Sequence, residues 1–123
     1  MPVVLLIEDD QENADMTIRI LQSANYEVIH TLRGYDGARI ARRQRPSAIL
    51  IDFDLPDIDG RTMALILKKQ LGQDSPPIVA VTARAGVAEM RMAEQFGCDG
   101  FVSKPFMPDE LLHVVEQVLR KPE

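Results

Sequence analysis

The segment that decides the fold is residues 48–54, which read Ala48-Ile49-Leu50-Ile51-Asp52-Phe53-Asp54. An apolar run that ends abruptly in an acid is typical of a strand that is buried on both faces and stops at a polar edge. Strands buried on both faces belong to parallel sheets that helices cover. The segment therefore predicts an α/β protein in which Asp52 stands at the carboxyl end of a buried strand.

Segments on both sides of this one extend the pattern. Four more have the length and composition of strands: Val3–Ile7, residues 26–31, Ile78–Thr82 and Gly100–Ser103. Segments with helical periodicity fill the gaps, which predicts a doubly wound, parallel five-stranded sheet with helices on both faces. Right-handed crossovers favour the flavodoxin-like strand order 2-1-3-4-5. Residues 26–31 alternate in polarity, so we expect that strand at an edge.

Apolar stripes in the helical segments predict which helix faces pack on the sheet. We expect the core faces to be Met16, Ile20, Leu21 and Ala24 in the first helix, Met63, Ala64, Leu67 and Leu71 in the third, Ala88, Met92 and Phe96 in the fourth, and Leu111, Leu112, Val115, Val118 and Leu119 in the last. Asp59 reads as a helix cap and Pro108 as a first-turn residue. Asp57 reads as a turn residue.

Length and composition bound the classes of function. A chain of 123 residues with 46% hydrophobic and 27% charged residues is expected to form one domain, residues 1–123. No apolar run is long enough to insert into a membrane. The single cysteine, Cys98, cannot form an intrachain disulfide, which favours a reducing compartment such as the cytoplasm. The net charge of −5 argues against direct binding of nucleic acid. Arginines 39, 42, 43 and 45 lie where cations complement a helix dipole.

Charged and hydroxyl side chains follow the ends of four predicted strands. These residues are Glu8, Asp9 and Asp10 after the first, Asp52 and Asp54 at the third, Thr82 at the fourth and Lys104 after the fifth. In a doubly wound sheet they meet at one edge, where ligands bind. Carboxylates gathered in this way favour a divalent cation with oxygen ligands, and Mg²⁺ is the expected ion. Asp10 alone is explained as well by a helix cap.

This edge also predicts phosphoryl chemistry. Asp52 is held rigidly by its strand, as a nucleophile toward phosphorus requires. The Lys104 ammonium and the Thr82 hydroxyl can stabilise the oxygens of a transferring phosphoryl group, together with the metal ion.

The motifs resemble the response-regulator receiver domain of two-component signalling, in its CheY-like single-domain form. The matching pieces are Ile7-Glu8-Asp9-Asp10, Ile51-Asp52-Phe53-Asp54-Leu55-Pro56 followed by Asp59-Gly60, Val81-Thr82-Ala83, and Ser103-Lys104-Pro105-Phe106. Four such pieces in order at strand ends are specific, and they cover nearly the whole chain.

The resemblance implies a role for each matching residue. Asp52 is the phosphoacceptor, Asp9 and Asp52 bind Mg²⁺ directly with the Asp54 carbonyl, and Glu8 acts mainly through water. Thr82 and Lys104 contact the phosphoryl group, and Phe101 is the aromatic switch. The donor is a histidine kinase or histidine phosphotransfer protein, and the chain is a switch and not a turnover enzyme. Val87 and Met90, opposite the inner stripe of the fourth helix, are hypothesised to contact a downstream protein.

Two alternatives stay open at this point. Asp52-Phe53-Asp54 also resembles the opening motif of haloacid-dehalogenase phosphatases, with Asp52 as nucleophile and Asp54 as general acid; that family, however, places its acidic pair after this motif and carries a substrate cap. The chain can also be a receiver excised from a larger regulator with a DNA-binding output. No output module follows the last helix up to Glu123, so we expect action through another protein, and the intact gene length decides the point.

Overall fold

The computed structural model describes residues 1–120 and has the predicted five-stranded parallel sheet, in the order β2-β1-β3-β4-β5. The strands are β1 (Val3–Ile7), β2 (Glu27–Thr31), β3 (Ala48–Asp52), β4 (Ile78–Thr82) and β5 (Gly100–Ser103). Strand β2 is at an edge, as its alternating polarity predicted, and begins one residue later than expected. The predicted domain extends to residue 123, and residues 121–123 lie outside the described part.

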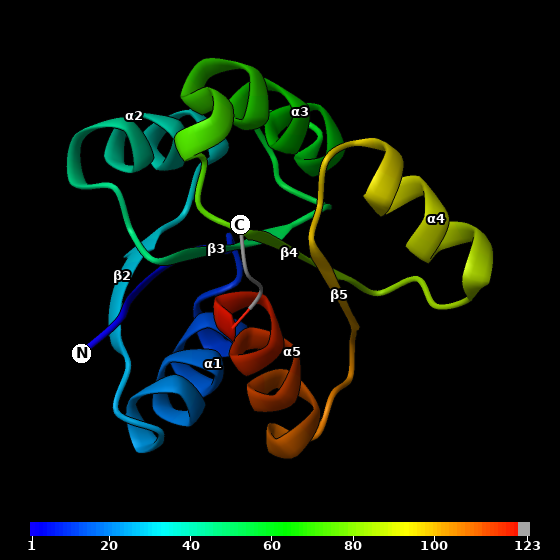
Figure 1. Ribbon diagram of the computed structural model, residues 1–123. Coiled ribbons are helices and arrows are strands. Elements are labelled where there is room, and N and C mark those ends of the chain that lie inside the picture. Colours follow the sequence, from blue (N-terminus) through cyan, green and yellow to red (C-terminus); the bar gives the residue numbers. More distant parts are fainter. Residues whose placement is uncertain (121–123) are drawn as a thin grey trace.

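Helices cover both faces of the sheet. They are α1 (Gln11–Ser23), α2 (Gly34–Gln44), α3 (Gly60–Leu71), α4 (Val87–Gln95) and α5 (Pro108–Arg120), and the short 3₁₀ helix η1 (Gly72–Asp74) follows α3. Figure 1 shows α2 and α3 over one face, α1 and α5 over the other, and α4 beside β5 at the edge. This arrangement is the α/β, doubly wound (βα)5 fold that the sequence predicted.

The strand side chains alternate between two cores. Leu5, Ile7, Ile49 and Ile51 belong to the core under α2 and α3, whereas their neighbours Val4, Leu6 and Leu50 belong to the core under α1 and α5. Successive residues of a strand point to opposite faces, so a strand covered by helices on both sides must be apolar throughout. All five residues of β3 are accordingly buried, which places Asp52 at the end of a fully enclosed strand.

Two of the predicted helix faces are partly wrong. In α1 the buried residues are Ala14, Thr17, Ile20 and Leu21, while Met16 is 46% exposed and Ala24 is exposed beyond the helix end. In α4 the buried residue is Ala93, and Ala88 is exposed. In α1 the spacing of Ala14, Thr17 and Leu21 sets the inner face, and Met16 lies outside it. Ala88 lies in the first turn of α4, before the buried Ala93. The expected faces of α3 and α5 agree with the structure, since Met63, Leu67, Leu111 and Val115 are buried.

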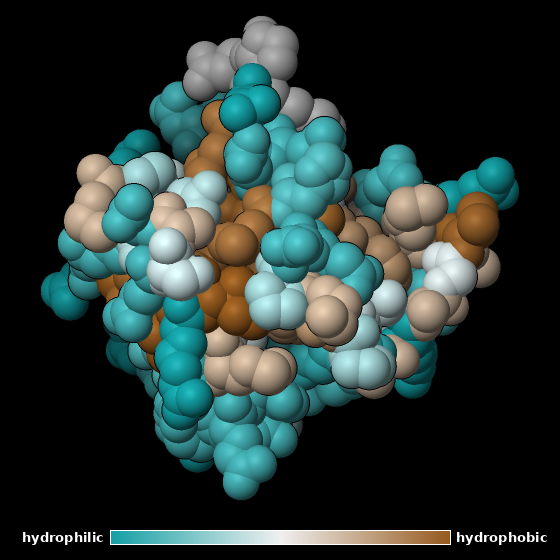
Figure 2. Space-filling view, turned by 90° about the horizontal axis from the view of Figure 1, so that it is seen from below, coloured by the Kyte–Doolittle hydropathy of each residue, from teal (hydrophilic) through white to brown (hydrophobic). Residues whose placement is uncertain are grey.

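The face formed by α1 and α5 has an apolar centre. Figure 2 shows this surface bordered by polar side chains. Ile18, Phe106 and Leu112 are half-buried residues packed against the core on this side. Among residues 1–120, no helix has the length and apolar character needed to cross a membrane.

Candidate functional site

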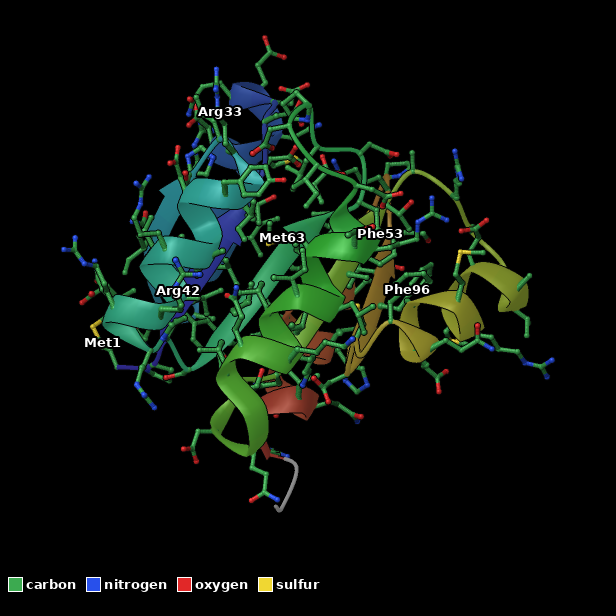
Figure 3. The ribbon with its side chains drawn as sticks, turned by 90° about the horizontal axis from the view of Figure 1, so that it is seen from above. Met1, Arg33, Arg42, Phe53, Met63 and Phe96 are labelled. Atoms are coloured by element: carbon green, nitrogen blue, oxygen red, sulfur yellow. The ribbon has the colours of Figure 1, made fainter. Side chains whose placement is uncertain are left out.

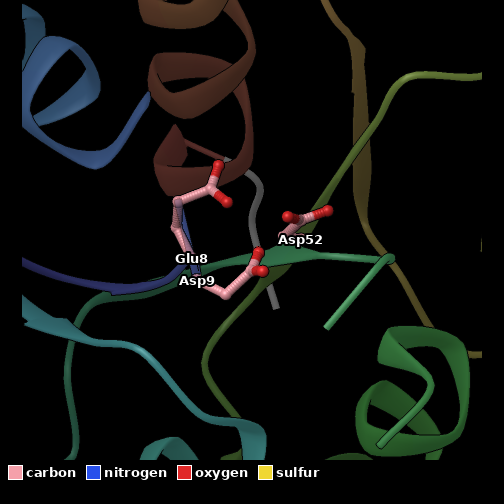
Figure 4. Close-up of side chains that lie close together, drawn as sticks. All are labelled: Glu8, Asp9 and Asp52. Atoms are coloured by element: carbon pink, nitrogen blue, oxygen red, sulfur yellow. The ribbon is translucent and has the colours of Figure 1, made fainter. Parts of the chain in front are cut away.

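Three carboxylates meet where β1 and β3 end. Glu8 and Asp9 directly follow β1, and Asp52 is the last residue of β3, the neighbouring strand. Each offers an oxygen atom within 4.8 Å of the others, and Figure 4 shows the three side chains gathered at this edge. Glu8 and Asp52 are buried, whereas Asp9 is exposed. Hard carboxylate oxygens at this spacing suit a divalent cation such as Mg²⁺.

Lys104 reaches this cluster from the loop after β5. Its Nζ donates to Glu8 Oε1 at 2.8 Å and to Asp52 Oδ2 at 3.4 Å. Burial alone would lower the pKa of Lys104, but the hydrogen bond to Glu8 and the charge of Asp52 outweigh it and raise that pKa. One ammonium group therefore stays charged between two buried carboxylates, at the place where the sequence predicted a contact with a phosphoryl group.

Among the three carboxylates, Glu8 has a clearly raised pKa. Burial, followed by its hydrogen-bonded neighbour Asp52, raises its pKa to about 7, against the lowering effect of Lys104. Lys104 therefore compensates the carboxylates only in part near neutral pH. A bound divalent cation would supply the missing positive charge, so the donor set fits such an ion on physical grounds.

The backbone after β3 fixes the Asp52 side chain. The Asp54 N–H donates to Asp52 Oδ1 at 2.9 Å, so each oxygen of the carboxylate has a defined neighbour. Gly60, the first residue of α3, approaches Asp52 closely, since a Cβ there would lie 2.4 Å from the Asp52 carbonyl oxygen. The Asp54 side chain is exposed. The site thus has its central carboxylate in one orientation.

Thr82 and Phe101 lie on the next two strands. Thr82 is 1% exposed, and its Oγ1 accepts a hydrogen bond from the Arg84 N–H at 3.1 Å. Thr82 and Asp54 line the same small hollow. Phe101 is half-buried and lines a separate cavity of about 450 Å³ between α4 and β5, which Met90 also lines. Thr82 thus lies at the site edge of the sheet, whereas Phe101 borders α4.

Val87 and Met90 do not belong to the acidic cluster. They lie on α4 and are 59% and 41% exposed. Their exposure agrees with a position away from the core.

His30 is one contributor that the sequence gave no reason to select. Its Nε2 lies 2.9 Å from the Glu8 carbonyl oxygen, and the Glu8 N–H donates to the Thr31 carbonyl at 3.1 Å. Strand β2 therefore fixes the backbone of the first acidic residue from both sides. Asp10 accepts hydrogen bonds from the N–H groups of Glu12 and Asn13 and so caps α1, as the sequence analysis had allowed.

Asp57 is more than the turn residue that the sequence suggested. Its Oδ1 accepts from the Gly34 N–H at 3.0 Å and its Oδ2 from the Tyr35 N–H at 3.1 Å. Burial works against its ionisation, but these backbone donors outweigh that effect and lower the pKa of Asp57. The only sequence signal was indirect: α2 begins after Arg33, which cannot accept a hydrogen bond from a helix N-terminus.

The candidate site is therefore a sheet edge lined by carboxylates, with one lysine and one threonine, in a (βα)5 fold. The family model for the response regulator receiver domain matches residues 4–116. This chain belongs to that family. Membership decides against the haloacid-dehalogenase alternative and identifies the chain as a receiver domain of two-component signalling.

Relatives and solved structures agree with the membership. The polar-differentiation response regulator DivK of Brucella anthropi is 29% identical over 116 residues, which cover 94% of both chains. The receiver domain of the sensor histidine kinase PA1611 from Pseudomonas aeruginosa, solved with a magnesium ion coordinated in its active-site cleft, is 31% identical with a TM-score of 0.88 and 98% coverage of both chains. The Vibrio cholerae chemotaxis protein CheY4 is 26% identical with a TM-score of 0.88, covering 96% of this chain and 98% of that one.

Proposed function

We propose that this receiver domain accepts a phosphoryl group on Asp52 from a phosphohistidine of a histidine kinase or a histidine phosphotransfer protein. One observation carries the proposal. Asp52 is buried at the end of β3, with one carboxylate oxygen held by the Asp54 N–H and the other facing Lys104. A nucleophile fixed in this way is prepared for in-line attack on phosphorus.

The transfer itself needs few groups. A carboxylate oxygen of Asp52 forms a bond to phosphorus while the bond from phosphorus to the donor histidine nitrogen breaks, and that nitrogen keeps the electron pair. A carboxylate nucleophile needs no general base. The Lys104 ammonium, 3.4 Å from Asp52 Oδ2, and the Thr82 hydroxyl would stabilise the phosphoryl oxygens.

The acidic cluster is proposed to hold Mg²⁺. Asp9 and Asp52 would bind it directly together with the Asp54 carbonyl, and Glu8 would act through water. When bound, the ion neutralises the carboxylates and stabilises charge on the phosphoryl oxygens. The mutual proximity of Glu8, Asp9 and Asp52 supports this assignment, as does the magnesium ion in the related PA1611 receiver.

The response to phosphorylation is proposed to pass through Thr82 and Phe101 to α4. New charge at Asp52 attracts the Thr82 hydroxyl, and Phe101 then moves into the space that Thr82 leaves. Converting a mostly inactive population into a mostly active one takes about 5.5 kcal/mol of differential stabilisation, which a few charge-assisted hydrogen bonds can largely supply. Val87 and Met90 on α4 would then contact a downstream protein.

The chain would thus act as a switch that is phosphorylated and dephosphorylated, and not as a turnover enzyme. Its cytoplasmic location stays a prediction from the sequence.

Incubation with a small phosphodonor, with and without Mg²⁺, tests the proposal. Intact-mass spectrometry should show one added phosphoryl group on the wild type with Mg²⁺, and none after chelation or in Asp52→Asn. Asp54→Asn is the matched control, because the exposed Asp54 side chain is replaced while its carbonyl remains. An unlabelled wild type, or equal labelling of Asp52→Asn, would refute the proposal.

A further inference from the structure

The residue before helix α2 provides no side-chain acceptor for the first N–H groups of the helix. The first N–H groups of a helix need acceptors from outside the helix, usually the side chain of the residue before it. That residue is Arg33, which has the extended backbone of a helix cap (φ −127°, ψ 144°) but makes no capping hydrogen bond. The acceptor for this helix therefore comes from elsewhere.

Asp57 supplies it from 23 residues away. Its two carboxylate oxygens each accept one N–H of the first turn, from Gly34 at 3.0 Å and Tyr35 at 3.1 Å. A carboxylate at the positive end of a helix dipole is also favoured electrostatically. Unlike a local cap, this one joins two separate segments: the start of α2 and the loop between β3 and α3.

That loop, residues 53–59, includes Asp54 beside the phosphoacceptor site. Its base is closed by a hydrogen bond from the Gly60 N–H to the Phe53 carbonyl at 3.1 Å, and the Asp54 N–H is held by Asp52 Oδ1 at 2.9 Å. Leu55 is buried, and Ile58 packs against the same core. A Cβ on Gly34 would lie 2.5 Å from Ile58 Cγ2, so the loop lies directly on the start of α2.

Figure 3 shows the same arrangement from above. Arg33 lies at the end of α2 near which the chain leads into α3, and Arg42 lies toward the other end of α2. The hydrogen bonds of Asp57 therefore join α2 to the loop at the end of the sheet where Asp52 stands.

We propose that Asp57 is a positioning residue: its carboxylate clamps the loop 53–59 to the first turn of α2 and thereby holds the Asp54 backbone in place beside Asp52. The consequence for the loop depends on these contacts alone. The consequence for Mg²⁺ binding rests on the proposed function, in which the Asp54 carbonyl is a ligand. Supporting residues of this kind commonly change metal affinity by about tenfold or more.

The test separates clamping from simple helix capping. Asp57→Ala removes the clamp, and the double variant Arg33→Ser/Asp57→Ala gives α2 a local serine cap, at a residue with cap geometry, without restoring the link to the loop. The two substitutions together leave the net charge unchanged. Arg33→Ser alone is the control.

Amide hydrogen exchange of the metal-free proteins is the first readout. Asp57→Ala should lower the melting temperature and speed exchange of the Asp54 and Gly60 amides by about tenfold. In the double variant the melting temperature should recover while exchange at Asp54 and Gly60 stays fast. Exchange that returns to the wild-type rate in the double variant, or never changes, would overturn the clamp, because a cap alone would then explain Asp57.

Calorimetric titration with Mg²⁺ is the second readout. The dissociation constant for Mg²⁺ should be about tenfold larger in both variants that lack Asp57, and unchanged in Arg33→Ser. Wild-type affinity in the double variant, despite fast loop exchange, would overturn the link between the clamp and the metal site. A wild type that binds no Mg²⁺ would instead refute the metal assignment of the proposed function, and the exchange rates would still decide on the clamp.

Gly34→Ala provides an independent variant with Asp57 intact. Its new methyl group would meet Ile58 and push the loop away from α2. The clamp predicts faster exchange at Asp54 in this variant too. Wild-type exchange there would show that contact between the loop and α2 does not position Asp54.

Discussion

The end of β3 and helix α4 differ sharply in how firmly they are held. Every residue of β3 is buried, and Asp52 at its end is fixed by the Asp54 N–H and by Lys104. In contrast, α4 buries only Ala93 among its nine residues. Chemistry at phosphorus needs fixed geometry, whereas an element that reports a state must change position at low cost in free energy. The difference agrees with the proposal that the chemistry takes place at the end of the sheet and that α4 responds to it.

The largest expected effect concerns the rigid region. Leu50→Ala, at the fully buried centre of β3, should lower the free energy of unfolding by about 3 kcal/mol, because it leaves a cavity in a close-packed core. Val87→Ala on α4 is the control and should change it by less than about 0.5 kcal/mol. Urea denaturation measures both. Similar losses for the two variants would show that β3 and α4 do not differ in how firmly they are held.

The second effect is the pH dependence that Glu8 produces in the metal-free protein. The pKa of Glu8 is about 7 in the folded chain, above its ordinary value of 4.5, so the folded state binds more protons than the unfolded state between these pH values. Stability should therefore fall as pH rises from about 4.5 through 7, by roughly 3 kcal/mol from this group. Denaturation at a series of pH values, with chelator present, measures the slope.

The Glu8→Gln variant and added Mg²⁺ test whether Glu8 produces this pH dependence. In the glutamine variant, the free energy of unfolding should depend much less on pH, because residue 8 no longer titrates. Mg²⁺ should stabilise the wild type more at pH 8 than at pH 5, since the ion binds the ionised carboxylates. A slope that survives in Glu8→Gln would assign the pH dependence to another group.

A smaller effect is expected where α3 touches α4. Arg61 Nη1 donates to Met92 Sδ at 2.8 Å, while the same guanidinium pairs with Asp59. Met92→Leu conserves volume and removes this acceptor, so the free energy of unfolding should change by less than about 1 kcal/mol. Amide exchange in α4 should become faster while exchange in β3 stays the same. Equal acceleration in both elements would show that α4 is not independently mobile.

The smallest effect on stability is expected at the proposed partner surface. Val87→Ser combined with Met90→Gln replaces two exposed side chains, so the free energy of unfolding should change by less than about 0.5 kcal/mol. Affinity of the phosphorylated protein for its downstream partner should nevertheless fall, by about tenfold or more, if these residues are central to that contact. Unchanged affinity, measured by calorimetry, would show that Val87 and Met90 do not contribute to the interface.

Local sequence was a good guide wherever one interaction dominated. The strands were predictable because burial on both faces forces apolar runs, and the cap at Asp59 was predictable because its acceptor and donors are neighbours in sequence. The inner face of α1 was harder. Met16 is more hydrophobic than Thr17, yet Thr17 is buried, because it lies three residues after the buried Ala14 and its hydroxyl donates to the Asn13 carbonyl.

The residue pattern alone was enough to predict the alternation of strands and helices, the edge position of β2 and the acids that gather at one edge of the sheet. Periodicity and strand order follow from short-range sterics and from the burial of apolar surface, which the residue pattern records directly. The tertiary structure was needed for the individual long-range contacts: His30 against the Glu8 carbonyl, the hydrogen bonds of Lys104 to Glu8 and Asp52, and Asp57 at the start of α2. These contacts join segments far apart in the chain, and their distances exist only once the sheet has brought its strand ends together.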